Sequence, residues 1–150
     1  LLDNIGKKIT LDEIRNTVKI LKKHKIKIHN NFIIGLPWET EKTAGETIRF
    51  ATELDSDYAS FFISAPFPGT KYFAYSMINK LIPSELDFTN AYYEPIVRAH
   101  DLTKERISEL HKQAIKRFYL RPKIILKTLI SIKSFTDLKL YLKNFTNLIS

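Results

Sequence analysis

Two short stretches combine small, polar and turn-forming residues in a way that could hold a ligand. Residues 30–40 read NNFIIGLPWET, an apolar run that stops at Gly35 and is followed by a proline and then a helical pattern. Residues 58–70 repeat this arrangement, with an aromatic run that ends at Ser64, Ala65 and Pro66. Loops at the carboxyl ends of parallel strands are where α/β proteins bind ligands. The two stretches therefore predict one binding site at neighbouring strand ends.

Titratable side chains point to no further site. The chain contains no cysteine, which excludes disulfides, thiolate catalysis and iron–sulfur ligation by these residues. The four histidines lack the spacing of metal ligands. Glu39 is interpreted as an acid favoured by the dipole of the helix that follows it. A Ser-His-Asp or paired-carboxylate site stays open, because its members meet only in space.

The elements that carry the two stretches follow from hydrophobic spacing. A capping box formed by Thr10 and Glu13 predicts a helix over residues 11–24. Residues 26–34 predict a strand, Thr40 or Thr43 begins a second helix, and residues 58–64 predict a second strand. A third helix runs from Thr70 to about residue 79. This strand–helix–strand–helix order with short connections predicts parallel pairing of the strands.

Beyond Pro83 the pattern changes. Residues 84–101 have little periodicity and predict an irregular segment. Thr103 then begins a helix whose inward residues are Ile107, Leu110, Ala114 and Phe118, and further helices are expected over 124–132 and from Thr136. We therefore expect an α/β unit over residues 1–82, followed over residues 83–150 by an irregular segment and a helical extension.

Composition limits the class of protein. Of the 150 residues 44% are apolar and 27% charged, as in globular proteins, and no apolar run approaches the roughly 20 residues that span a bilayer. The cytoplasm is the default location. The net charge is +8, and residues 112–150 hold nine Lys and Arg against the single acid Asp137. This excess fits a solvated helical face, a face that covers an acidic neighbouring domain, or a surface for nucleic acid or anionic membrane.

With these motifs set out, the chain resembles the C-terminal part of a radical S-adenosylmethionine (SAM) enzyme. It is most similar to the cobalamin-associated group, which carries a cobalamin-binding domain ahead of the barrel. Three segments in this order support the resemblance: FIIGLPWET at 32–40, PFPGTKYF at 66–73 and RFYLRP at 117–122. The resemblance implies a partial, TIM-like (β/α) barrel, in which residues 26–35 are the fifth strand and residues 58–64 the sixth.

The resemblance also implies a role for individual residues. In the family, the fifth strand carries a Gly-x-Ile-x-Gly pattern whose isoleucine packs on the adenine of SAM. Ile33 and Gly35 match this pattern, whereas Asn31 stands at the first glycine and Trp38 replaces a frequent glycine of the following turn. The end of the sixth strand, at Ser64, Ala65 and Pro66, would supply backbone contacts to the same adenine.

The catalytic centre would lie elsewhere in the intact protein. The family binds a [4Fe–4S] cluster through three cysteines near its first strand, and this chain has none. Because the chain begins at Leu1 and its only methionine is Met77, we expect a piece of a longer protein, either truncated or a degraded reading frame. The intact parent is expected to cleave SAM reductively, with cobalamin as a further cofactor, for methyl transfer or radical modification of a small molecule.

The piece alone is expected to be inactive, to be marginally stable because of open sheet edges, and to have as its main partner the missing N-terminal part of the same protein. The alternative is a non-catalytic, basic helical module that binds nucleic acid or an anionic surface. We consider nucleic acid the less favoured partner.

Overall fold

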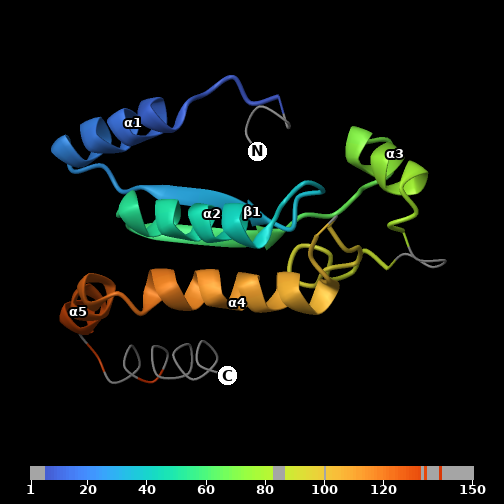
Figure 1. Cartoon of the computed structure of the whole chain (residues 1–150). Coiled ribbons are helices and arrows are strands. Elements are labelled where there is room, and N and C mark those ends of the chain that lie inside the picture. Colours follow the sequence, from blue (N-terminus) through green and yellow to red (C-terminus); the bar gives the residue numbers. More distant parts are fainter. Residues whose placement is uncertain (1–5, 83–86, 100, 133, 135–138, 140–150) are drawn as a thin grey trace.

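Two parallel strands joined by a helix form the centre of the fold (Figure 1). The computed structural model describes residues 6–82, 87–99, 101–132, 134 and 139. Within them are two strands and five helices: α1 (Leu11–Lys23), β1 (His29–Ile34), α2 (Glu41–Glu53), β2 (Tyr58–Ile63), α3 (Lys71–Ile78), α4 (Lys104–Tyr119) and α5 (Pro122–Ser131). The predicted α/β class and parallel pairing are confirmed. Two strands are too few to define a barrel.

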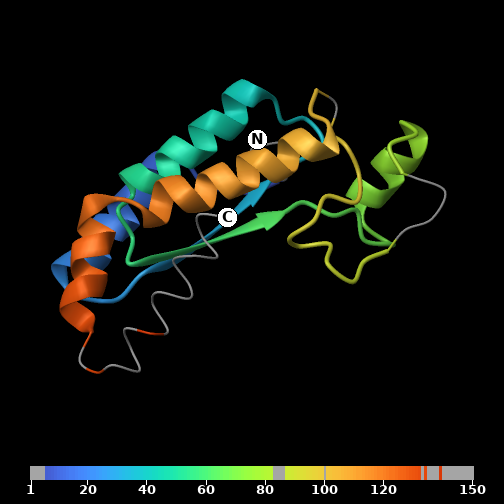
Figure 2. The same cartoon turned by 90° about the horizontal axis from the view of Figure 1, so that it is seen from below.

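One face of the sheet is covered by α2 and α4, which lie side by side over it (Figure 2). In β1 and β2 alternate residues point toward these helices, as expected for a pleated strand with one covered face. The resulting core joins strand residues to the inward faces of both helices and includes Ile34, Phe61, Ile63, Ala44, Ile48, Ala51, Ile107, Leu110, Ala114 and Phe118. The inward residues predicted for α4 are therefore confirmed.

A smaller cluster attaches α1 to the same layer. Val18 of α1 packs with Ile28, which precedes β1, and with Leu54 at the end of α2. The Thr10 and Glu13 capping box predicted at the start of α1 is present, with the Thr10 amide 2.7 Å from Glu13 Oε2. No helix in the part of the chain that the structure describes has the length and apolarity to cross a membrane.

The two outer edges of the sheet differ. Along β2, the carbonyl of Phe61 lies 2.8 Å from His111 Nε2, and the carbonyl of Ala59 accepts a hydrogen bond of 2.7 Å from the Tyr119 hydroxyl. The Ile63 amide donates to the Tyr92 carbonyl at 2.8 Å. Side chains of α4, together with a backbone carbonyl of the irregular segment, thus form hydrogen bonds with the backbone groups along this edge. Along β1, no segment among the described residues pairs with the outer edge.

The predicted helix starts are confirmed where they depend on a capping residue next to the helix. Thr10, Thr40, Thr70 and Thr103 each cap a helix through the side chain, and residues 87–99 are irregular as expected. The predicted start of the first strand at residue 26 is wrong. Lys25 has a φ of 56°, and the Ile26 amide returns to the Leu21 carbonyl at 3.0 Å, so this stretch ends α1 instead. The helix predicted from Thr136 lies outside the described residues.

Candidate functional site

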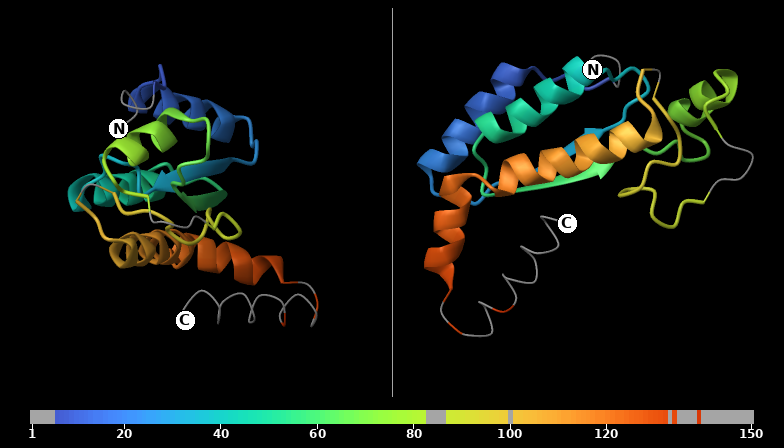
Figure 3. Two further views of the ribbon diagram at one scale, coloured as in Figure 1. Left: turned by 90° about the vertical axis from the view of Figure 1, so that its right-hand side faces the viewer. Right: turned by 60° about the horizontal axis from the view of Figure 1, so that its bottom comes forward.

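The carboxyl ends of β1 and β2 lie side by side, as the two sequence stretches predicted. The Ser64 amide donates to the Ile34 carbonyl at 2.8 Å, which extends the ladder one step beyond the last strand pair, Ile34 with Ile63. Gly35 and Ser64 therefore follow the same pair at the same end of the sheet. α3 lies beyond this end, away from the layer formed by α2 and α4 (Figure 3).

Gly35 ends β1 in a conformation that suits glycine. Its φ is +85°, and a Cβ at this position would lie 2.9 Å from Cγ2 of Ile107 in α4. The family resemblance implied that Gly35 belongs to the strand pattern that borders the adenine of SAM. In the structure, the space on the side where a Cβ would stand is filled by Ile107, so the close approach that Gly35 permits there is that of α4.

Glu39 folds back on the strand end instead of facing solvent. It is 0% exposed, and its Oε2 accepts a hydrogen bond from the Gly35 amide. Oε1 is buried and has no hydrogen-bond partner among the described residues. Burial raises the pKa of Glu39 to about 7, against the opposing effect of the backbone hydrogen bonds from Gly35 and Leu36. Because Thr40 is the N-cap of α2, Glu39 precedes the helix, and the interpretation as a first-turn acid is wrong.

α3 contributes two further polar groups to this end of the sheet. Burial raises the pKa of Tyr72 to about 12; its hydroxyl lies near Ser64 but makes no hydrogen bond of normal geometry. The Ser76 hydroxyl, one helical turn further on, is also buried and has no hydrogen-bond partner in the described part of the chain. Trp38 in the loop after β1 packs edge-on against Tyr75 of α3, with ring centroids 5.4 Å apart. The contact ties the loop after β1 to α3.

The predicted site residues differ in how accessible they are. Ile33 is 46% exposed and lies on the uncovered face of the sheet, opposite Phe62 in the strand register. Ser64 and Ala65 are half-buried, whereas Gly35 and Pro66 are buried. The arrangement therefore offers an apolar surface at Ile33 and partly accessible backbone at 64–65, rather than a deep pocket.

Sequence reasoning missed three residues of this site. Glu39, Tyr72 and Ser76 have buried oxygen atoms for which the described residues supply no hydrogen-bond partner. The sequence could have indicated that Tyr72 and Ser76 lie together, because residues four apart are on the same face of a helix. A signal for Glu39 was its position before Thr40, outside the helix. In the described ranges, no three His, Asp or Glu side chains gather as a metal-ion site.

Comparison with known proteins identifies several relatives of the chain. No family model matches it. The chain is 37% identical over 135 residues, 90% of its length, to an uncharacterized methyltransferase of Pyrococcus horikoshii. It is 29% identical over 117 residues (77%) to tRNA-2-methylthio-N(6)-dimethylallyladenosine synthase of Ehrlichia ruminantium. It is also 27% identical over 122 residues (80%) to the anaerobic magnesium-protoporphyrin IX monomethyl ester cyclase of Cereibacter sphaeroides.

The matches cover only a part of each relative. The chain spans 29%, 24% and 19% of the lengths of these three proteins. The part aligned with the Pyrococcus horikoshii protein is 90% of the chain, so it includes the two strand ends, their loops and α4. These relatives are radical SAM proteins, and the chain matches one part of each of them.

Proposed function

We propose that the carboxyl ends of β1 and β2 form the adenine-side wall of a SAM site in a longer parent enzyme. The observation that carries the proposal is the hydrogen bond from the Ser64 amide to the Ile34 carbonyl, because it brings Gly35 next to Ser64, Ala65 and Pro66. Two backbone segments with few protruding side chains then border one apolar surface. Binding of a purine needs this combination.

The groups around this wall fit an adenine ring. Ile33 presents a partly exposed aliphatic side chain, on which a flat ring can stack. The Tyr72 hydroxyl and Glu39 Oε1 are buried oxygen atoms without hydrogen-bond partners among the described residues. A buried polar group of this kind costs stability unless another group forms a hydrogen bond with it. A heterocycle that carries both donors and acceptors would supply such bonds. Ile33, Ser64, Ala65 and Pro66 would contact the ring, and Gly35 would hold the strand end against α4.

The two outer edges of the sheet differ in hydrogen bonding, and this difference supports a position of β2 at the end of a longer sheet. The outer edge of β2 is satisfied by His111, Tyr119 and Tyr92, so a further strand has no place there. The outer edge of β1 is open among the described residues. We infer that a preceding strand from the N-terminal part of the same protein pairs with β1. Residues 1–82 would then end the barrel and residues 83–150 extend it, with α4 covering β2.

The cluster and any cobalamin belong to other parts of the parent. This chain has no cysteine, so its residues do not fit a [4Fe–4S] cluster. The cluster, bound elsewhere, would supply the electron for reductive cleavage of SAM. The description of the Pyrococcus relative as a methyltransferase favours methyl transfer over other radical modifications. Cobalamin as the methyl carrier is part of the same proposal and rests on the family resemblance.

The test uses the full-length parent, prepared without oxygen, with SAM affinity and 5′-deoxyadenosine formation as readouts. Ile33→Ala is expected to weaken SAM binding roughly tenfold, since it removes most of one apolar contact. Ile78→Ala is the matched control, because Ile78 is 81% exposed on α3. Equal SAM affinities of the two variants would refute the adenine wall. A continuous parent frame without a three-cysteine motif would remove the enzyme assignment altogether.

The alternative, a basic helical module that binds nucleic acid or an anionic surface, depends on the charge of residues 112–150. Its test is the salt dependence of binding, because phosphate contacts release counterions and affinity then falls steeply with salt. α4 packs its apolar face into the core, so the described part of this region has a structural role that the alternative does not require.

A further inference from the structure

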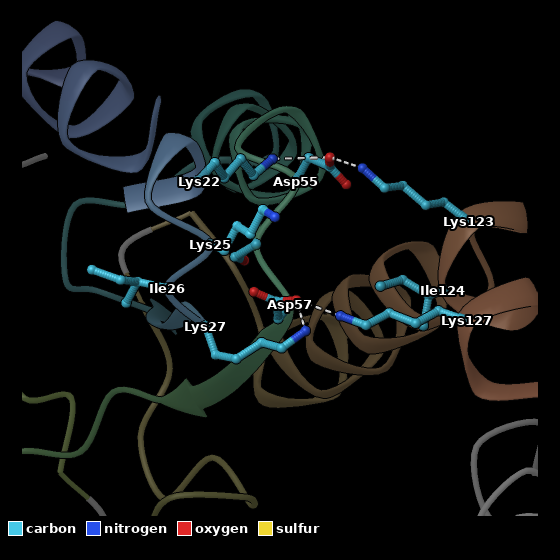
Figure 4. A pocket seen from close by; sticks show the side chains of 10 residues that line it. Lys22, Lys25, Ile26, Lys27, Asp55, Asp57, Lys123, Ile124 and Lys127 are labelled. Carbon is cyan, nitrogen blue, oxygen red and sulfur yellow. Dashed lines mark hydrogen bonds and ion pairs between the residues drawn. The ribbon is translucent and has the colours of Figure 1, made fainter. Parts of the chain in front are cut away.

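A second candidate site lies at the amino ends of the strands, opposite the proposed SAM wall. A cavity of about 260 Å³ opens between the end of α1, the segment before β1, the loop before β2 and the first turns of α5 (Figure 4). Because each strand has six residues, the cavity and Gly35 are about 20 Å apart. The two sites are therefore independent.

The cavity wall carries an excess of positive charge. Five lysines line it, with two aspartates between them: Lys22, Lys25, Lys27, Lys123, Lys127, Asp55 and Asp57. The lysines come from two directions, three from α1 and the segment before β1 and two from α5, and they meet over the loop of residues 55–57 (Figure 4). With five positive charges against two negative ones, the wall has three positive charges more than its own carboxylates neutralise.

Each aspartate is already shared among several cations. Asp55 accepts from Lys22 at 2.9 Å and from Lys123, and Asp57 accepts from Lys27 at 3.3 Å and from Lys127. Partial burial opposes the ionisation of Asp57, but its bonds from Lys127, the Ile28 amide and Lys27 lower its pKa to about 2. Both aspartates thus stay charged and hold the lysines close together. An ammonium group has three donors, so each lysine can keep its carboxylate and still bind another anion.

Two groups in the wall have no partner of their own. The Lys25 ammonium makes no hydrogen bond or ion pair among the described residues. Ser56 is only 1% exposed, it lines the cavity, and its hydroxyl has no hydrogen-bond partner there. α5 begins at the cavity with Lys123 and Ile124 in its first turn, and no side chain caps that helix end. The amides of this first turn are not the anion donors, because Pro122 has no N–H and the Ile124 amide donates to the Arg121 carbonyl at 2.9 Å. The buried Ser56 hydroxyl without a partner is what favours a bound acceptor.

We propose that this cavity binds a short polyphosphate group, a diphosphate or triphosphate. Lysines bind phosphate as point charges, and several phosphate oxygens would use the excess charge together with the Ser56 hydroxyl. The volume is below the range of about 300–1,000 Å³ that is typical of pockets for drug-sized ligands, so it suits a phosphate chain without an attached base and sugar.

The test is equilibrium dialysis of the 150-residue chain, at low micromolar concentration and low ionic strength, against inorganic tripolyphosphate. Lys25→Gln and Ser56→Ala are each expected to weaken binding about tenfold, the effect of losing one hydrogen bond to a charged group. Lys42→Gln, an exposed lysine in the first turn of α2, matches the charge change of Lys25→Gln away from the cavity and is expected to leave binding unchanged. The fluorescence of Trp38 checks that each variant is folded.

Three results would overturn the proposal. The first is no binding of tripolyphosphate to the folded wild-type chain. The second is an equal loss of affinity in Lys25→Gln and Lys42→Gln, since binding would then report net charge alone. The third is binding of a single-stranded oligonucleotide that Ser56→Ala leaves unchanged while tripolyphosphate does not compete, which would indicate a nucleic-acid surface. Competition by tripolyphosphate together with the Ser56→Ala loss supports the polyphosphate site.

Discussion

Cγ2 of Ile107 lies 2.9 Å from the point where a Cβ would stand at Gly35. This contact joins the end of β1 to α4, a helix that follows it at a great distance along the chain. Because Gly35 also has a φ of +85°, both its conformation and its size are required at this point. The strand end that borders the proposed SAM wall is therefore held from the opposite side by α4.

Gly35→Ala is expected to destabilise the fold by about 2–4 kcal/mol, the sum of a left-handed alanine and an overpacked contact with Ile107. Two glycines serve as controls in the same denaturation experiment. Gly69 has a φ of +83° and open space around it, so Gly69→Ala measures the cost of the left-handed backbone conformation alone, about 1 kcal/mol. Gly45 lies inside α2 with nothing within 4 Å, so Gly45→Ala is expected to stabilise slightly. A Gly35→Ala loss no larger than that of Gly69→Ala would contradict the contact.

The parts of the fold that local chemistry determines could be predicted from the sequence. Thr10, Thr40 and Thr70 begin helices because a threonine side chain bonds an amide three residues ahead, and such a signal needs no tertiary context. The parallel pairing followed from the order of elements and the short connections. The start of β1 could not be predicted, because the apolar alternation at residues 26–28 competes with the hydrogen bonds that end α1.

The roles of the site residues required the tertiary structure. Nothing near Gly35 in the sequence indicates Ile107, and nothing near Glu39 indicates that its carboxyl group is fully buried. Ser56 stands between two aspartates in the sequence, and nothing in that pattern indicates a buried hydroxyl for which the described residues supply no partner. Burial and missing partners depend on which segments pack together, and a pattern within one segment carries no information about this.

The stability of the chain is expected to depend on pH through Glu39. Burial raises the pKa of the folded-state carboxyl group to about 7, from an ordinary value of 4.5, so the folded state holds a proton that the unfolded state has released between these two values. The contribution of Glu39 to the free energy of unfolding is fully present below about pH 4.5. It is lost as the pH rises through 7, by roughly 3 kcal/mol in all.

Glu39→Gln removes this dependence. The difference in unfolding free energy between wild type and Glu39→Gln, measured from pH 4.5 to 8.5, is expected to fall with pH and then to level off. The exposed Glu46 on α2 provides the control, since Glu46→Gln is expected to give a flat difference. A flat difference for Glu39→Gln as well would show that the carboxyl group is solvated in the folded chain.

His111 is expected to act in the opposite direction. Burial lowers the pKa of this imidazole below 6.5, so its contribution is present above that pH and is lost as the pH falls below it. Its Nε2 lies 2.8 Å from the Phe61 carbonyl. His111→Leu leaves that carbonyl without a partner and is expected to cost about 1–3 kcal/mol at neutral pH, and to remove the loss on acidification.

Tyr119→Phe tests the same edge of β2 without a titrating group. The Tyr119 hydroxyl donates to the Ala59 carbonyl at 2.7 Å, so its removal is expected to cost about 1–3 kcal/mol in chemical denaturation. Tyr93→Phe is the matched control, because Tyr93 is largely exposed. Similar stabilities of the two variants would mean that the carbonyl of Ala59 is hydrated, and that the β2 edge is not closed by α4.

The open edge of β1 is expected to make the chain self-associate. Its uncovered face presents Ile33 beside Phe62, and an unpaired strand edge next to apolar side chains is a template for pairing with another copy. Ile33→Lys sets a charge at this edge and is expected to shift the sedimentation profile toward the monomer. Ile78→Lys makes the same change on α3 and is expected to leave association unaltered. A wild-type chain that stays monomeric at all concentrations, with a sharp and reversible thermal transition, would mean that β1 needs no further strand, and the inference of a preceding strand would fail with it.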